Sequence, residues 1–344
     1  MKAMVTTAMK TGNLMVQLTD DHMLKPGKAG TTVLDRSVKR LIRGVSGMDD
    51  ALFINADPVT MRTSYPGKLA VHAVCNGMYA KGYAPRQCTL TVLLPEGSTE
   101  EELRRIIDQA ARTAEEENIK ICGGHTEVTG AVTRPVVCAS AAGVPMRKTD
   151  AEKSREITGA AAGDGLSLIM TGYAGIEGSF LMASECTGRL QEHFSAELTK
   201  QAALMFSGMM SVRAAAEALA GLLTGVPLHT VSLSEGGVYA GLWKICEELS
   251  CGMRVYFDRI PILQETVEMS NALAVDPYGM QSAGSLLIAA ADPGPVLECL
   301  DKAGVPAVCI GELVPGNDRI LINDDEERFL DRPKTDTLYP VLGF

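Results

Sequence analysis

The sequence has few aromatic residues and no long apolar run. Aromatic residues make up 5% of the 344 residues, and there is a single tryptophan. The longest apolar stretch, near Leu286–Ala291, is far shorter than the roughly 20 residues that a membrane-spanning helix needs. Residues 1–10 show no apolar core of the kind that a signal peptide carries. We therefore expect a cytoplasmic protein that binds no membrane.

An excess of basic residues is also missing. Thirty-two Lys and Arg against forty-two Asp and Glu give a net charge of −10. A general nucleic-acid binder would carry a basic face, so this balance argues against nucleic acid as a partner. It leaves room for a phosphate ligand held by a few local groups. The nine cysteines follow no disulfide framework, which is typical of reduced thiols in a cytoplasm.

The familiar nucleotide-binding motifs are absent too. The chain contains no G-x-x-x-x-G-K-[ST] loop and no well-placed G-x-G-x-x-G fingerprint. A Walker-type or Rossmann-type nucleotide site is therefore excluded.

Length and composition predict two domains. At about 150 residues per domain, 344 residues suffice for two cores, and 46% of the residues are hydrophobic. Residues 1–30 look like a flexible lead-in. A polar, charge-dense stretch at 146–156 and small residues at 159–165 place the boundary near residue 155. We expect an N-terminal domain over 1–155 and a C-terminal domain over 156–344.

Apolar periodicity predicts an irregular alternation of helices and strands, and hence an α/β or α+β class. Ser98 and Glu101 have the spacing of a capping box for the clearest helix. The expected helices cover 33–43, 67–81, 99–118, 198–223 and 238–249. The expected strands cover 51–55, 89–94, 119–122, 135–144, 166–170, 255–257 and 285–290.

Three carboxylates flank the first expected strand of the N-terminal domain. Asp49 and Asp50 precede this strand, and Asp57 follows it. Clustered carboxylates are costly unless a cation neutralises them, and Mg²⁺ accepts a few carboxylates together with water and phosphate oxygens. The alternative is that Asp57 caps a turn before Pro58 while the Asp pair is solvated.

The segment Cys122–Val128 is a second candidate. Gly123 and Gly124 would let a ligand approach the backbone without obstruction by a Cβ atom. His125 and Glu127 would then project polar groups from the same loop. An ordinary turn with a solvated Glu127 is the alternative, and one Cys-x-x-His spacing without a second pair is weak evidence for zinc.

Two further segments could contact an anion. Ser234-Glu235-Gly236-Gly237 stands at an expected helix start, where exposed N–H groups favour an anion, although a simple cap is the plainer interpretation. Lys28 lies in a Gly- and Lys-rich lead-in and could close over phosphates, or could belong to a basic tail.

Taken in order, several segments resemble one family. They are Gly47–Ala51, Asn55–Asp57, Gly67–Asn76, Gly123–Val128, Gly172–Gly178, Glu235–Gly237 and the run from Ile260 to Leu287. With this order and spacing the chain resembles the aminoimidazole ribonucleotide synthetase (PurM-like) superfamily over about residues 24–315. The nearest branch is the HypE-like, AIR synthase-related proteins.

The resemblance implies a two-domain α/β protein in which the N-terminal sheets of two chains form a barrel across a homodimer, with a C-terminal α/β sandwich. It implies Mg²⁺ and ATP as cofactors, with phosphoryl transfer to a small-molecule or protein-carried acceptor. Carried over by position, the metal ligands would be Asp49, Asp50 and Asp57. The nucleotide-binding residues would be Lys28, Asp57, Asn76, Gly123, Gly124 and Thr126, and the catalytic groups would be His125, Glu127 and Glu235.

The chain departs from the family pattern at three acidic positions. Gly77 stands where the family has the Asp of an Asn-Asp pair, His125 stands where several members have an acid, and Thr230 replaces the Asp of a His-Asp pair. The last cysteine is Cys309, so a reactive cysteine at the C-terminus is not expected. Two functions therefore remain open: an ATP-dependent enzyme with an unknown acceptor, and a catalytically degenerate, dimeric nucleotide sensor or scaffold.

Overall fold

The computed structural model describes residues 16–18, 24–26, 53–146, 165–222, 228–324 and 326–343. Four sequence-based expectations lie outside these residues: the helix at 33–43, the roles of Lys28, those of Asp49 and Asp50, and the domain boundary near residue 155.

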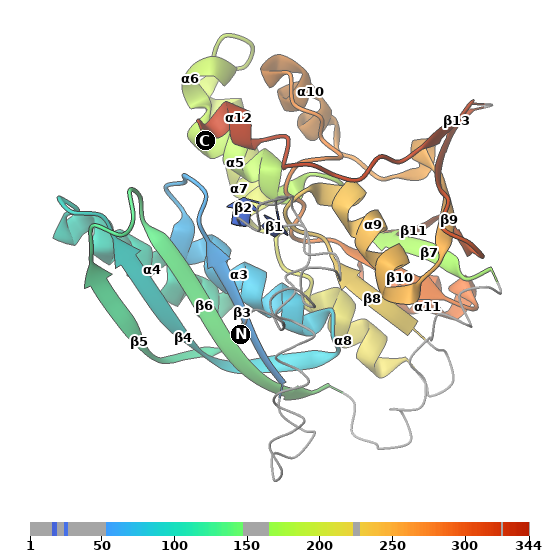
Figure 1. Cartoon of the computed structure of the whole chain (residues 1–344), viewed down its shortest axis with the longest axis horizontal. Helices are drawn as coiled ribbons and strands as arrows, with labels where there is room; N and C mark the ends of the chain where they lie inside the picture. The colour runs from blue at the N-terminus through green and yellow to red at the C-terminus, as the bar shows by residue number, and fades with distance from the viewer. Residues whose placement is uncertain are drawn as a thin grey trace.

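The N-terminal part is a four-stranded sheet with two helices on one face (Figure 1). Its strand order is β3-β6-β4-β5, in which β4 and β5 are parallel and the other pairs are antiparallel. The elements are β3 (Phe53–Val59), α3 (Pro66–Tyr79), β4 (Tyr83–Leu94), α4 (Glu100–Glu116), β5 (Lys120–Val128) and β6 (Val136–Pro145). Helix α4 provides the crossover that a parallel strand pair requires.

Helix α4 forms where apolar periodicity predicts it, but it begins one residue later than the capping-box spacing indicates. Thr99, not Ser98, is the N-cap, and its side chain accepts a hydrogen bond from the Glu102 amide at 3.1 Å. Three glutamates in the first turn favour the same start because they complement the helix dipole. Ile106 and Ala110 are fully buried on the side that faces the sheet.

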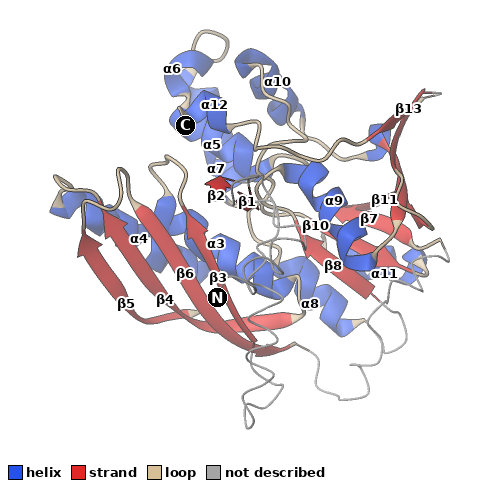
Figure 2. Cartoon of the chain, viewed as in Figure 1, coloured by secondary structure: helices blue, strands red, loops and turns tan. Residues whose placement is uncertain are grey.

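The C-terminal part is built on a seven-stranded sheet of order β13-β12-β9-β11-β7-β10-β8 (Figure 2). Its strands are β7 (Ser167–Thr171), β8 (Leu228–Ser232), β9 (Gly252–Tyr256), β10 (Leu286–Ala290), β11 (Ala307–Val314), β12 (Arg319–Asn323) and β13 (Glu326–Phe329). The α-helices are α5 (Ile176–Glu185), α6 (Thr187–Leu190), α7 (Ala196–Ser207), α8 (Arg213–Gly221), α9 (Gly237–Leu249), α10 (Gln264–Leu273), α11 (Pro293–Lys302) and α12 (Tyr339–Leu342), with a short 3₁₀ turn at Phe257–Arg259. Every residue of β10 is buried, as expected of a strand that is covered on both faces.

Near the N-terminus two short strands, β1 (Val16–Leu18) and β2 (Leu24–Pro26), pair antiparallel. The mixed α/β class expected from the sequence is therefore confirmed, with two main sheets. A barrel formed across a dimer stays a prediction.

Two expected elements differ from the structure. The helix expected at 198–223 is two helices, α7 and α8, with a break at residues 208–212. The strand expected to end at Gly123-Gly124 continues through both glycines to Val128, with a register shift against β4 at Cys88 and Thr89.

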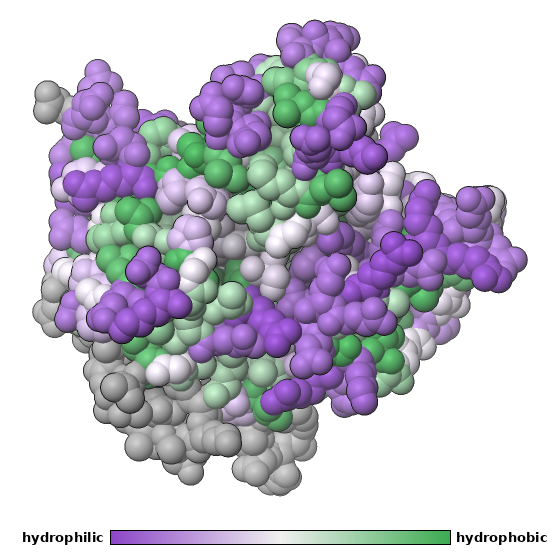
Figure 3. Space-filling view, turned by 180° about the vertical axis from the view of Figure 1, so that it is seen from behind, coloured by the Kyte–Doolittle hydropathy of each residue, from purple (hydrophilic) through white to green (hydrophobic). Residues whose placement is uncertain are grey.

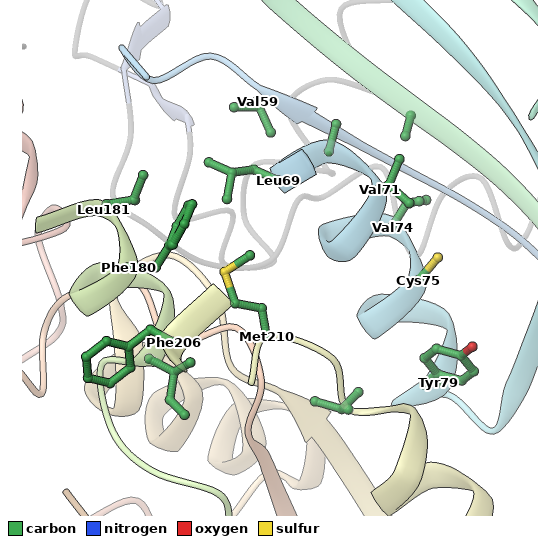
Figure 4. Packing of buried hydrophobic residues seen from close by; sticks show 14 of the residues in the cluster. Val59, Leu69, Val71, Val74, Cys75, Tyr79, Phe180, Leu181, Phe206 and Met210 are labelled. Carbon is green, nitrogen blue, oxygen red and sulfur yellow. The ribbon is translucent and has the colours of Figure 1, made fainter. Parts of the chain in front are cut away.

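Helix α3 lies between the two parts of the molecule and belongs to both cores. Figure 4 shows Leu69, Val74 and Tyr79 of α3 in one packed region with Phe180 of α5 and Met210. Met210 and Phe206 are fully buried and Phe180 is 4% exposed. Continuous apolar packing therefore fixes how the two sheets are placed.

Large apolar side chains that remain exposed lie on several elements. In the rear view, apolar patches stand among hydrophilic ones (Figure 3). Among the residues that the structure describes, the exposed large apolar ones are Ile54, Ile107, Val128, Leu198, Leu204, Met205 and Phe329. Within the described ranges, every helix is too short or too polar to span a membrane.

Candidate functional site

Strand β5 carries the Gly-Gly segment at the edge of the N-terminal sheet, and its two glycines have different roles. A Cβ atom on Gly124 would lie 2.0 Å from the carbonyl oxygen of Leu90 on β4. The strand pairing itself therefore requires glycine at this position. A Cβ atom on Gly123 would meet nothing closer than 3.9 Å, so packing does not require glycine there.

Beside these glycines lies a hollow of about 220 Å³ between β5 and α4. Apolar side chains and strand backbone form its walls. They come from Leu90, Val92, Ile107, Ile121, Gly123, Gly124, His125 and Thr126. Three residues expected to contact the nucleotide, Gly123, Gly124 and Thr126, thus line one hollow, together with His125, which is expected to be catalytic.

Although His125 borders the hollow, its side chain and that of Glu127 project from the other face of the same strand. Register pairs His125 with the exposed Thr91, whereas the buried Leu90 and Val92 pair with Gly124 and Thr126. Successive side chains of a strand point to opposite faces, so His125 and Glu127 project from the open face, away from the helices. Their Nε2 and Oε2 atoms are 3.3 Å apart, and both side chains are more than half exposed.

Asp57 lies at the opposite edge of the sheet, on β3. Asn55, two residues earlier, donates from Nδ2 to the Val74 carbonyl of α3 at 3.3 Å, so this side of the strand faces the helices. Asp57 shares that side. Because three strand spacings separate β3 from β5, Asp57 and Glu127 are about 14 Å apart or more within one chain.

Asn76, expected to bind the nucleotide, is 2% exposed and joins the two domains. Its Nδ2 donates to the Met210 carbonyl at 2.7 Å, and its Oδ1 accepts from the Val212 amide at 3.0 Å. Both partners lie in the break between α7 and α8. The structure thus gives the Asn76 amide a domain-joining role.

Glu235 stands at the start of α9, among carboxylates that sequence reasoning did not assign. Gly236 is the N-cap of this helix in a left-handed conformation (φ 75°), and its amide donates to Asp336 Oδ2 at 2.7 Å. Tyr339 donates from its hydroxyl to Glu235 Oε1. Glu177, in the first turn of α5, accepts from the Ala283 amide at 3.4 Å.

Glu177 and Asp336 are buried and Glu235 is half-buried; the three carboxylates repel one another, and their pKa values rise. Burial, reinforced by the charge of Asp336, raises the pKa of Glu177 to about 8. Burial also raises the pKa of Asp336 to about 7, against backbone hydrogen bonds that favour its ionised form. The pKa of Glu235 is likewise raised by burial. Asp57 and Glu235 both contribute to the shift of Glu177, so these two predicted site residues belong to one electrostatic cluster.

Two of the departures from the family pattern have structural explanations. A Cβ atom on Gly77 would lie 2.5 Å from Asn55 Nδ2, so the Asn55 side chain occupies the space that a larger residue would need. Thr230 donates from its hydroxyl to the Ala80 carbonyl across the domain junction. His229 pairs with Glu248 at 2.7 Å, and Lys81 joins the same carboxylate at 3.1 Å.

The described residues of a single chain therefore form two separate groups. One is the β5 hollow with Gly123, Gly124 and Thr126. The other is the domain junction with Asp57 and Glu235, to which the structure adds Glu177 and Asp336. In the described part of the chain, no three His, Cys, Asp or Glu side chains gather in a way that could hold a metal ion.

Sequence reasoning did not assign Glu177, Asp336 or Tyr339, and only the first of these lies in a segment that could have identified it. Glu177 lies inside the Gly172–Gly178 segment that carries the family resemblance, so its position could have marked it. Asp336 and Tyr339 lie in a C-terminal stretch without a recognisable motif, and only the fold brings them to α9.

Comparison with known proteins agrees with this architecture. Residues 42–144 match the family described as "AIR synthase related protein, N-terminal domain". Residues 163–323 match "AIR synthase related protein, C-terminal domain".

Two relatives of known sequence carry names from hydrogenase maturation. The chain is 22% identical over 224 residues to a putative hydrogenase expression/formation protein of Methanocaldococcus jannaschii. It is 26% identical over 222 residues to the carbamoyl dehydratase HypE of Rhodobacter capsulatus. The alignments cover 65% and 64% of this chain, and each spans 61% of the relative's length.

Solved structures share the fold over nearly the whole chain. HypE of E. coli superposes with a TM-score of 0.69 at 21% identity, covering 98% of this chain and 99% of that one. A HypE structure in complex with ATP gives 0.66 at 19% identity and covers 93% and 99%. A HypE–HypF complex gives 0.64 at 20% identity and covers 87% and 99%. Together the two matched domains and the shared fold show that the chain belongs to the AIR synthase related protein family.

Proposed function

We propose that this protein binds Mg²⁺-ATP and transfers a phosphoryl group to an oxygen atom of a small-molecule or protein-carried acceptor. The proposal rests on the family, on a similar fold solved in complex with ATP, and on the residues of strand β5. The identity of the acceptor stays open.

One observation carries the proposal above the others. Packing requires glycine at position 124 but not at position 123, where a Cβ atom would project toward Thr89 on the open face that His125 shares; yet both positions are glycine and both border the hollow beside α4. A glycine without a packing reason leaves backbone open to close approach by a ligand. Phosphate oxygens suit such a backbone because its N–H groups can donate to them.

The described residues fit the nucleotide and metal in part. Gly123, Gly124 and Thr126 would lie along the phosphates, and Asp57 would supply a carboxylate ligand for Mg²⁺, with Asp49, Asp50 and Lys28 as further predicted contacts. ATP supplies the phosphoryl group, and Mg²⁺ neutralises charge on the phosphates. Since protein side chains alone form no metal cluster in the described ranges, phosphate oxygens would complete the metal's ligands.

The catalytic roles of His125, Glu127 and Glu235 remain predictions with different structural support. His125 and Glu127 form an exposed pair that could orient an acceptor hydroxyl or accept its proton. Glu235 is half-buried and its carboxylate accepts a hydrogen bond from Tyr339, so this contact competes with binding of an acceptor at Glu235. Asn76 would contribute indirectly, by holding α3 against the break between α7 and α8, because its side-chain amide is hydrogen-bonded to Met210 and Val212.

A second copy of the chain would complete the site. The open face of the N-terminal sheet carries the exposed Ile54, and β5 and β3 are its two edges. If two such sheets close into a barrel, β5 of one chain can approach β3 of the other. We therefore propose a homodimer in which Asp57 of one protomer works with the Gly123–Glu127 segment of its partner.

Specific observations favour a second candidate, a dimeric nucleotide sensor or scaffold without turnover. Asn55 occupies the space beside Gly77, and the Thr230 hydroxyl is bound at the domain junction. Two positions that are acidic in the family pattern therefore serve packing here.

Isothermal titration with Mg²⁺-ATP, followed by an assay of ADP release, separates these functions. We expect saturable binding below millimolar concentration, and turnover that Asp57→Ala abolishes while the fold is retained. Asp57→Asn should weaken the Mg²⁺ dependence of binding more than recognition of the base. Binding without ADP release would favour the sensor, and no binding at millimolar ATP would rule out both functions.

A further inference from the structure

The C-terminal segment of the chain is tied into the domain junction. We name residues Thr335–Gly343 the C-terminal strap. Asp336 within it is fully buried and accepts backbone hydrogen bonds, among them those from Gly236 at 2.7 Å and from Leu338 at 2.9 Å. The strap's own carboxylate thus caps the start of α9.

Three further residues hold the strap in place. Thr337 donates from Oγ1 to the Asp276 carbonyl at 2.7 Å and from its amide to the Gly279 carbonyl at 3.1 Å. Leu338 is fully buried, and the Tyr339 hydroxyl donates to Glu235. Figure 1 shows the chain returning from β13 to end beside α5. The strap contacts Glu235 through Tyr339.

The groups that face Asp336 across this contact are acidic or phenolic. Glu235 precedes α9, Glu177 comes from α5, and Tyr339 comes from the strap itself. Asp57 on β3 adds its charge to that of Glu177. The guanidinium of Arg62 lies at the far end of the strap, where Nη1 is 3.9 Å from the place of a Cβ on Gly343. Glu177, Glu235 and Asp336 repel one another at this junction, so they cannot all be ionised without an electrostatic cost.

We infer that the C-terminal strap is a proton-controlled latch, which docks on α9 while the carboxyl groups of Asp336, Glu177 and Glu235 retain protons and loosens when all three are ionised. Loosening would break the contact between Tyr339 and Glu235 and open the junction. The latch does not depend on nucleotide binding; only the functional consequence of exposing Glu235 rests on the proposed function.

The pKa values place the transition in a physiological range. Burial, together with repulsion by Glu235, raises the pKa of Asp336 to about 7 against its backbone hydrogen bonds. The pKa of Glu177 is raised to about 8. Because these pKa values are raised in the docked state, docking is strongest at low pH and weakens as pH rises through about 7 to 8.

Hydrogen–deuterium exchange of the full-length protein between about pH 6 and pH 9 tests the latch directly. The amides of Thr337, Leu338, Val341 and Leu342 serve as reporters because each donates to a defined oxygen. After correction for intrinsic exchange, we expect their protection to fall at least about tenfold over this range. The amides of the buried strand β10 should keep their protection from exchange over the same pH range.

Asp336→Asn gives the matched comparison, with Asp331→Asn at an exposed position near the strap as control. In the Asp336→Asn variant, the protection of the strap amides should change much less with pH, whereas in Asp331→Asn it should change as in wild type. Protection that is equal at both pH values in wild type would overturn the latch, and so would a full pH response in Asp336→Asn. If Asp336→Asn does not fold, the pH dependence of strap protection in wild type still tests the latch.

Discussion

At the scale of single residues, the most unusual feature is the buried carboxylate Glu177. It is 8% exposed and accepts a backbone hydrogen bond from the Ala283 amide. Burial and the neighbouring Asp336 raise its pKa to about 8. A group with a raised pKa stabilises the fold fully below the unfolded value near 4.5, and this contribution is lost as pH rises through about 8.

Glu177→Gln should therefore stabilise the protein at alkaline pH. Glutamine keeps an oxygen for the Ala283 amide and removes the charge. We expect the free energy of unfolding to change little near pH 5 and to increase by roughly 2 kcal/mol near pH 8.5. This gain is smaller than the roughly 5 kcal/mol that corresponds to the full pKa shift of Glu177, because the native state relaxes around the charge. Urea denaturation at both pH values measures this. A gain of equal size at pH 5 would show that charge is not the cause.

At the scale of elements, the pairing of β4 with β5 gives two adjacent glycines different roles. Gly124 is required for the packing of the two strands, whereas Gly123 is not and is proposed to leave room for a ligand. Gly124→Ala would drive a Cβ atom against the Leu90 carbonyl at 2.0 Å, whereas Gly123→Ala would have open space. We expect Gly124→Ala to lower the free energy of unfolding by about 1–3 kcal/mol or more.

Gly123→Ala should leave stability within about 0.5 kcal/mol of wild type but weaken Mg²⁺-ATP binding several-fold. Thermal denaturation together with ATP titration of both variants checks the pair. Unchanged nucleotide affinity in a stable Gly123→Ala variant would contradict the proposal that the phosphates bind along β5.

Helix α3 owes its position to one amide as well as to apolar packing. Asn76→Ala would remove both hydrogen bonds to the α7–α8 break and leave Met210 and Val212 backbone groups buried without partners. We expect a loss of about 2–4 kcal/mol in the free energy of unfolding, measured by chemical denaturation.

Gln201→Ala is the control, because Gln201 is exposed on α7 and its side chain donates to Glu197 of the same helix. It should cost less than about 0.5 kcal/mol. A similarly small loss in Asn76→Ala would mean that the domain junction does not depend on this side chain.

Sequence reasoning succeeded where local rules decide and failed where distant contacts decide. The periodicity of α4 and the Gly236-Gly237 start of α9 are local, and both predictions are confirmed. The helix expected at 198–223 breaks because Asn76, 134 residues away from Met210, bonds to its carbonyl. β5 continues through two glycines because the neighbouring β4 supplies its partners. The site shows the same division, since no local pattern could bring Asp336 to α9.

At the scale of the whole molecule, the N-terminal sheet has helices on one face and an open face on the other. Ile54 on β3 is 46% exposed on the open face. A dimer that pairs these faces would bury it, so Ile54→Glu should convert a dimer of twice 36.6 kDa into a monomer.

Light scattering after gel filtration measures this mass. Leu204→Glu, at a 67% exposed position on α7, is the control and should remain dimeric. Wild type that is already monomeric at micromolar concentration would contradict a dimer formed through this face.

Subunit mixing tests whether two chains complete one active site. Asp57→Ala and Glu127→Gln variants would each lose ADP release alone, because every site in either homodimer lacks one group. After the two are mixed and allowed to exchange subunits, half of the dimers are mixed and each has one intact site. We expect ADP release to recover to about a quarter of the wild-type rate; no recovery, despite confirmed subunit exchange, would contradict a shared site.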